Sequence, residues 1–172
     1  MSLVNGLPAH ILLVHFVVVL VPLTALALVV AAIRPNVARR MGIVLPLTAL
    51  VTLVSVPLTT QAGEWLERHV GDTALVRRHT ELGDGLLPWA GGLFLLAAVV
   101  WWAARRTAAS GTSSEAGPRR SATSVRVVVA VLSLVVAAGA VVDVYRIGDS
   151  GAKAAWENGY SKTATGGDGD AG

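Results

Sequence analysis

Four long apolar runs constrain the fold of this chain more than any other feature of its sequence. They extend over Ile11 to Ile33, Gly42 to Ala62, Leu86 to Ala104 and Val127 to Val142, and none contains Asp, Glu, Lys or Arg. A helix needs about 20 apolar residues to cross about 30 Å of hydrocarbon. An open strand cannot satisfy its backbone in lipid, so even the β-branched fourth run is expected to be helical. The runs predict an all-α polytopic membrane protein with four transmembrane helices in an antiparallel up-down bundle.

The composition agrees with a lipid environment and excludes several kinds of site. Only 15% of the residues are charged, whereas soluble domains carry about 25%. The chain has no cysteine, which excludes disulfides, iron–sulfur clusters, thiolate zinc sites and covalently attached haem. The basic residues lie beside the apolar runs, where they act as topology signals. We therefore expect the lipid bilayer, and no nucleic acid, as a partner.

The charges of the loops predict the orientation of the bundle. The first loop and the third loop together carry eight arginines and a single acid, Glu115, whereas the second loop carries five acids and three arginines. Loops rich in Lys and Arg remain in the cytoplasm. The protein is therefore expected to be a multi-pass protein of the plasma membrane, with the second loop and both termini outside.

The sequence predicts one transmembrane domain over residues 1–158 and a disordered tail over 159–172. Its spans are expected at about residues 9–33, 42–69, 73–106 and 124–146, with a cytoplasmic linker rich in Ser, Gly and Ala at 107–123. The third helix is expected to run unbroken over about 50 Å at 1.5 Å per residue. It would then extend one or two turns beyond the hydrocarbon.

All four histidines fall at the predicted outer ends of these helices. His10 and His15 begin the first span, and His69 and His79 lie in the second loop. Ionisable residues near membrane depth usually mark a functional site. His10 and His15 are about 140° apart around a helix, so a regular helix cannot offer both to one small metal ion. His79 precedes Gly83 by one turn, and a glycine there lets a flat cofactor approach the backbone.

The first hypothesis for these residues is a b-type haem near the outer face that serves electron transfer to or from a redox partner protein. Helix bundles commonly hold cofactors between facing helices, and two imidazoles suit a haem iron. His15 and His79 are the expected axial ligands, with His10 as a neighbouring or alternative ligand. Gly83 would admit the ring, and Arg146 would bind a propionate.

Two other hypotheses stay open at this point. A protein that binds or senses a divalent metal would use nitrogen and oxygen ligands, chosen from His15, His79, His10, His69, Glu64 and Glu81. A structural or accessory subunit without a cofactor would use its histidines only as hydrogen-bonding groups. The motifs of serine hydrolases, P-loop enzymes and dinucleotide-binding enzymes are missing from the sequence, so no catalytic residue is assigned and a non-enzymatic role is favoured. The oligomeric state stays open.

Three segments carry a resemblance to a known family. They are GLPAHILLVHF (Gly6 to Phe16), VRRHTELG (Val76 to Gly83) and GDSGAKAAW (Gly148 to Trp156). These segments resemble the bacterial membrane family called domain of unknown function 2231, over nearly the whole chain.

The resemblance implies a four-helix membrane protein in which His10, His15 and His79 match the histidines of the family. Fusion of some relatives to Rieske or cytochrome c domains implies redox chemistry by association. The chain departs from the family pattern at Ile11 and Val17, where proline is usual, and it lacks the C-terminal histidine of many relatives.

Overall fold

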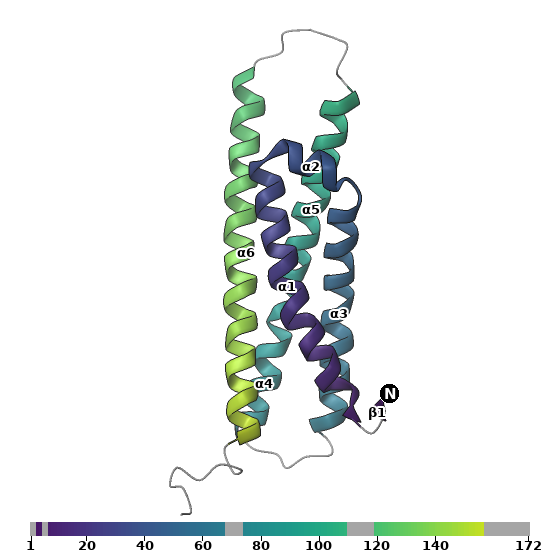
Figure 1. Cartoon of the computed structure of the whole chain (residues 1–172). Coiled ribbons are helices and arrows are strands. Elements are labelled where there is room, and N and C mark those ends of the chain that lie inside the picture. The colour runs from purple at the N-terminus through teal and green to yellow at the C-terminus, as the bar shows by residue number, and fades with distance from the viewer. Residues whose placement is uncertain (1–2, 5–6, 68–73, 110–118, 157–172) are drawn as a thin grey trace, which may run out of the picture.

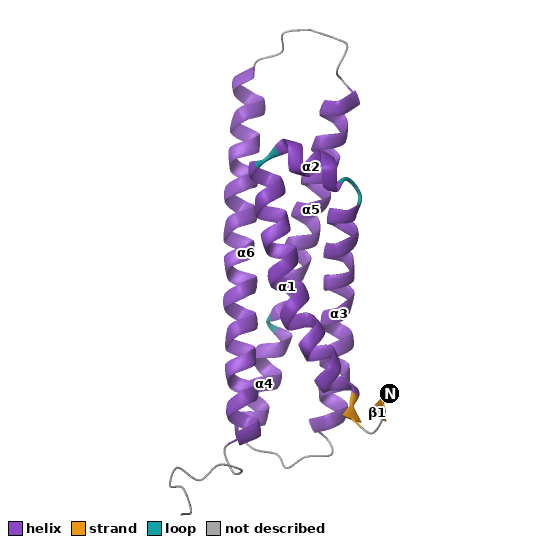
Figure 2. Cartoon of the chain, viewed as in Figure 1, coloured by secondary structure: helices purple, strands orange, loops and turns teal. Residues whose placement is uncertain are grey.

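The computed structural model describes residues 3–4, 7–67, 74–109 and 119–156, and nearly all of them are helical (Figure 1, Figure 2). Four helical segments are long and apolar enough to cross a membrane: His10–Ile33, Val44–Trp65, Ala74–Ala108 and Thr123–Ala154. They lie alongside one another and alternate in direction (Figure 1). The predicted all-α bundle with four spans is therefore confirmed.

The helices follow the four apolar runs, each with its own bounds. The spans are formed by α1 (Ala9–Ile33), α3 (Val44–Glu67), α4 (Ala74–Asp84) together with α5 (Leu86–Ala109), and α6 (Arg119–Trp156). A short antiparallel pairing of β1 (Leu3–Val4) with β2 (Leu7–Pro8) precedes α1.

The ends of these helices differ from the predicted boundaries in two places. The fourth helix extends beyond the predicted 124–146 in both directions. The predicted linker 107–123 is helical up to residue 109 and again from residue 119. The end of the second span, at residues 68–69, and the tail at 159–172 lie outside the described residues.

The first loop contains a short helix that the sequence analysis did not predict. This helix, α2 (Pro35–Met41), lies across the bundle between α1 and α3 (Figure 1). Proline at the first position of a helix loses no hydrogen bond and has a suitable backbone angle. Gly42 caps the end of the helix, and its φ of 52° is readily adopted by glycine. Buried Ala38 fixes α2 against the rest of the bundle.

The third span was predicted as one unbroken helix, and that prediction is wrong at a single residue. Gly85 separates α4 from α5, and its N–H donates to the carbonyl of Leu82 in a tight turn. Pro88 has no N–H to offer the carbonyl of Asp84, four residues before it. Glycine and proline together therefore interrupt the helix at this point.

The bundle packs through small side chains and presents large apolar ones to its surroundings. Ala49, Ala97 and Ala140 are fully buried between the helices, whereas Leu26 and Leu95 are more than 60% exposed. Small residues let transmembrane helices approach closely, and hydrocarbon solvates the large residues outside. This pattern is the one expected for helices whose outer faces contact lipid.

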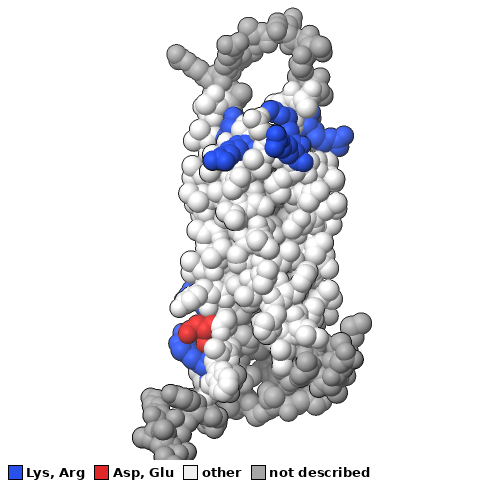
Figure 3. All heavy atoms as spheres, viewed as in Figure 1, with Lys and Arg blue, Asp and Glu red and all other residues white. Residues whose placement is uncertain are grey.

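The charged residues collect at the two ends of the bundle (Figure 3). A band of arginines lies at the end that carries α2, and the described acids lie toward the opposite end. The start of α1 and the end of α6 also lie at that opposite end (Figure 1). The start of α1 and the end of α6 therefore lie on one side of the membrane. The positive-inside rule predicts that this side is the outside.

Candidate histidine site

Two of the histidines, one on α1 and one on α4, meet between the helices at the end of the bundle where α1 begins and α6 ends. The ring centroids of His10 and His79 are 6.2 Å apart, and the ring planes are nearly perpendicular at 85°. Both side chains are partly buried. Residues 69 positions apart in the sequence thus form a pair of facing imidazoles.

The His10 ring lies directly on the backbone of α3. Its Nδ1 is 3.0 Å from the carbonyl oxygen of Thr59. A carbonyl oxygen only accepts, so Nδ1 must carry the proton and donate it. A Cβ atom added at Gly63 would be 3.0 Å from Cε1 of His10 and 3.1 Å from its Nδ1. Gly63 therefore gives the imidazole access to a carbonyl one turn earlier on the same helix.

The His79 ring lies on α6 in a similar way. Its Nδ1 is 3.0 Å from Oγ of Ser150, and that hydroxyl is 2.8 Å from the carbonyl of Ile147. Ser150 has a single proton, which it donates to that carbonyl, so its oxygen accepts from Nδ1 of His79. A Cβ atom at Gly151 would be 3.0 Å from Cε1 of the ring. Both imidazoles therefore lie over a glycine of the neighbouring helix.

These contacts determine the protonation pattern of both rings. Each neutral imidazole carries its proton on Nδ1, which leaves the lone pair on Nε2. Histidines that bind metals almost always donate the other ring N–H to a backbone carbonyl, a carboxylate or a water, which orients the ring. His10 and His79 show this arrangement, with a carbonyl and a hydroxyl as the acceptors. The pair can therefore offer two Nε2 atoms as ligands.

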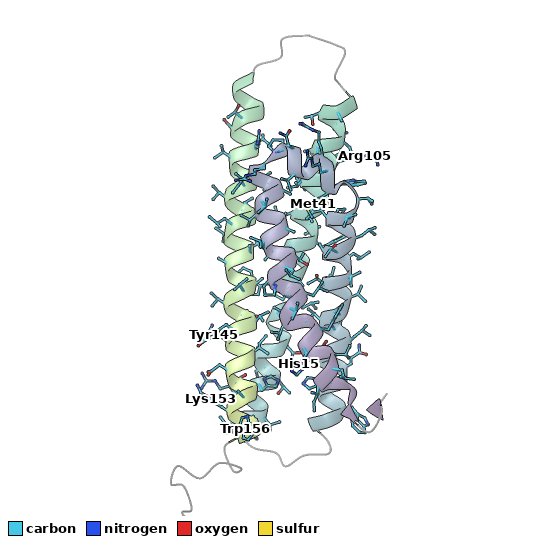
Figure 4. All side chains as sticks on the ribbon, viewed as in Figure 1. His15, Met41, Arg105, Tyr145, Lys153 and Trp156 are labelled. Atoms are coloured by element: carbon cyan, nitrogen blue, oxygen red, sulfur yellow. The ribbon has the colours of Figure 1, made fainter. Side chains whose placement is uncertain are left out.

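His15 does not join this pair. Its side chain is exposed, and its Nδ1 donates to the carbonyl of Ile11 in its own helix at a distance of 2.7 Å (Figure 4). The expected pairing of His15 with His79 is therefore replaced by a pairing of His10 with His79. The reason is the separation of about 140° between His10 and His15, which allows only one of them to face the bundle interior.

The other predicted site residues lie around the pair or away from it. Gly83 is beside α3, where an added Cβ would be 3.9 Å from the Thr60 methyl group. Glu64, Glu81 and Arg146 are exposed, and His69 lies outside the described residues. Within the described part of the chain, no three His, Asp or Glu side chains lie close enough together to hold a metal ion.

Ser150, Gly151 and Thr59 belong to the site although they were not predicted from the sequence as site residues. A signal for two of them was present, because Ser150 and Gly151 lie inside the third segment that carried the family resemblance. His10 lies in the first of these segments and His79 in the second. All three segments therefore meet at one end of the bundle.

A second contact on the same face of α6 lies deeper in the bundle. Asp143 approaches the break at Gly85, where an added Cβ would be 3.7 Å from its Oδ2. This oxygen is buried, and no hydrogen-bond partner for it is found among the described residues. The α4–α5 break thus has an intramembrane carboxyl group next to it, about two turns below Ser150.

Comparison with known proteins gives one match. The model of a family described as "Predicted membrane protein (DUF2231)" matches residues 6–164. No curated protein and no solved structure matches the chain. The family match covers the histidine pair and all four spans.

Proposed function

The chain belongs to the DUF2231 family of predicted membrane proteins, and we propose that it holds a b-type haem between His10 and His79 and serves electron transfer. The observation that carries the proposal is the pair of facing imidazoles, each with Nδ1 occupied by a hydrogen bond and Nε2 left as a ligand. The proposal assigns the protein to the plasma membrane, with the site near the outer face.

The spacing of the two rings supports a single iron between them. An imidazole nitrogen binds a transition metal at about 2.0 Å, and the ring centroid lies about 1.1 Å farther away, so two imidazoles that bound one metal would have centroids at most about 6.2 Å apart. The centroids of His10 and His79 are 6.2 Å apart. This centroid separation supports the proposal that both imidazoles would bind one iron.

The number of ligands favours haem over a bare metal ion. Protein zinc sites use three or four side chains. Among the described residues, the site brings together two imidazoles and no third group of that kind. A porphyrin supplies four nitrogens of its own and needs only two from the protein. A pair of histidines is therefore sufficient for haem, whereas it is insufficient for a typical zinc centre.

The residues of the chain would orient the ligands and tune them. When bound, haem supplies a one-electron redox couple. The Thr59 carbonyl and the Ser150 hydroxyl hold the rings of His10 and His79 and increase the electron density on Nε2. Because both His10 and His79 would bind the iron, the site would favour electron transfer over chemistry on a substrate.

Absorption spectroscopy of the purified full chain tests the proposal. Cells would be supplied with a haem precursor, and the protein is expected to show a Soret band that shifts on reduction with dithionite. His10→Ala and His79→Ala should each abolish or strongly reduce this band. His15→Ala is the matched control, because His15 is exposed on the same helix as His10, and it should retain the band.

Two outcomes would overturn the proposal. A folded, colourless wild-type protein from haem-replete cells would do so, as would a band that survives both substitutions. Elemental analysis of the same samples separates the alternatives. Metal without porphyrin would support a metal-binding or metal-sensing protein, and neither metal nor porphyrin would support a structural or accessory subunit.

A further inference from the structure

The end of the bundle opposite the histidine pair carries a strong positive charge. Its exposed arginines are Arg34, Arg39, Arg40, Arg105, Arg106 and Arg126 (Figure 3). None of the acids in the described residues lies at this end, since all of them belong to the end of α3, to α4 or to the last third of α6. The arginine band therefore attracts anions.

The short helix α2 adds a feature that loop charge alone does not explain. It packs against α5 as well as α1 and α3, and Ala38 is 4% exposed. The next two residues, Arg39 and Arg40, remain exposed and line an open pocket of about 330 Å³ together with Asn36. The packing of α2 thus holds two guanidinium groups at the rim of the span, where a freely moving loop would not fix them.

A second pocket on α5 combines aromatic rings with arginines. Trp101, Trp102, Arg105 and Arg106 line an open space of about 320 Å³. The guanidinium of Arg106 stacks 3.6 Å from the ring centroid of Trp102, and that of Arg105 lies 5.2 Å from the Trp101 ring. Stacking of this kind orients a guanidinium on the face of an aromatic ring. The pocket therefore has an apolar side and a cationic rim.

We propose that this end binds an anionic phospholipid, with its phosphate held by arginines of α2 and α5 and its acyl chains along the apolar surface below. Large apolar side chains, including Ile43, Val44 and Leu47, are about half exposed where the span begins next to α2. Basic pockets between helices at the cytoplasmic side are a known way of binding acidic lipid headgroups. This inference does not depend on the histidine site.

The charges also predict which lipids are rejected. A zwitterionic headgroup brings a cation beside its phosphate, and that cation would meet arginines and no acid among the described residues of this end. Phosphatidylglycerol carries the phosphate without a cation. Selectivity for phosphatidylglycerol over phosphatidylcholine is therefore the central expectation, and inorganic phosphate, which has no acyl chains to contact the apolar side, should bind far more weakly.

Native mass spectrometry of the full chain in neutral detergent tests the proposal. We expect phosphatidylglycerol to bind with an affinity at least tenfold higher than that for phosphatidylcholine. The double variant R40Q/R105Q should lower the affinity for phosphatidylglycerol about 30-fold, because each basic residue near an acidic lipid contributes about a factor of five. Arg78→Gln, a change at an exposed arginine of the opposite end, is the matched control and should leave the affinity unchanged.

A fluorescence measurement keeps the proposal testable if the double variant fails to fold. Phosphatidylglycerol with brominated acyl chains should quench the tryptophan fluorescence of the wild-type chain more than brominated phosphatidylcholine does. The difference should shrink in Trp102→Phe. The proposal would be overturned by equal quenching by the two lipids or by equal affinity for them. It would also be overturned if inorganic phosphate stabilised the protein as much as phosphatidylglycerol does.

Discussion

At the scale of single residues, Gly63 is the position where adding one methyl group has the clearest effect on the histidine site. The added Cβ would be 3.0 Å from Cε1 of His10, a ring that is held by Thr59 and faces His79. Gly63→Ala is therefore expected to displace the imidazole and to lower the free energy of unfolding by about 1–3 kcal/mol. The absorbance of the proposed haem band should also decrease in this variant.

Gly148→Ala provides the control for Gly63→Ala. Gly148 is also a helical glycine near the same end, but nothing lies within 4 Å of its added Cβ. Alanine there should leave the stability unchanged or raise it by up to about 1 kcal/mol, since glycine is the poorer helix former. Thermal unfolding in detergent compares the two variants, and equal melting temperatures would contradict the predicted crowding at His10.

Buried hydroxyl groups allow a second prediction at this scale. Thr24 and Thr52 share a hydrogen bond of 2.8 Å between α1 and α3, whereas the buried Oγ of Ser133 finds no partner among the described residues. Hydrogen bonds between transmembrane helices contribute about 0.6 kcal/mol on average. Thr24→Val should therefore destabilise the bundle by about that amount.

Ser133→Ala should be neutral or slightly stabilising, because it removes a buried polar atom that makes no described bond. Chemical unfolding of both variants beside the wild type measures the difference. A larger loss of stability in Ser133→Ala than in Thr24→Val would show that the hydroxyl of Ser133 has a partner that the described contacts do not include.

The sequence predicted the end of the molecule where the site lies, and it named His79 with His10 as an alternative ligand, but it did not predict the pairing of these two residues. All four histidines were placed at one side because the apolar runs determine which positions lie at that side. The choice between His10 and His15 depends on the rotation of α1, and shifting the start of a helix by one residue rotates its faces by about 100°. The roles of Gly63 and Gly151 depend on which helices are neighbours, and periodicity within one segment carries no such information.

At the scale of elements, the contact between α5 and α6 depends on Gly139. The six-membered part of the Trp89 indole lies over this glycine, and an added Cβ would overlap with its Cζ3. The indole is rigid, so the two helices must separate or the ring must move. We expect Gly139→Ala to lower the free energy of unfolding by about 3 kcal/mol, which is at the upper end of the range for overpacked cores.

A double-mutant cycle tests this explanation. Trp89→Leu alone should lower stability through lost contacts, but it removes the ring that the new methyl group would meet. In the double variant G139A/W89L, the alanine should therefore lower the stability much less than it does when Trp89 is present. Additive effects of the two substitutions, measured by thermal unfolding, would contradict the predicted contact.

The elements themselves were largely predictable, with two exceptions that share a cause. The apolar runs determined the four spans because only a helix satisfies its own backbone in lipid. The helix α2 and the break at Gly85 both depend on local backbone chemistry at proline and glycine, namely Pro35 with Gly42 and Gly85 with Pro88. Run length and hydropathy do not register such features.

At the scale of the whole molecule, the two ends of the bundle differ in chemistry, and their orientation determines which compartment meets the histidine site. The arginine band predicts that the α2 end faces the cytoplasm. The histidine pair would then face outward, and the redox partner of the proposed haem site would lie outside the cell. The opposite orientation would present the same site to cytoplasmic reductants.

Labelling of single cysteines determines this orientation, and the chain suits the experiment because it contains no cysteine of its own. Ala152→Cys places a thiol at an exposed position near the end of α6, and Thr107→Cys places one at an exposed position near the end of α5. A membrane-impermeant maleimide added to intact cells should label the first variant and not the second. Permeabilised cells should label both, which confirms that each thiol is accessible. Labelling of Thr107→Cys alone in intact cells would reverse the predicted topology and, with it, the compartment proposed for the redox partner.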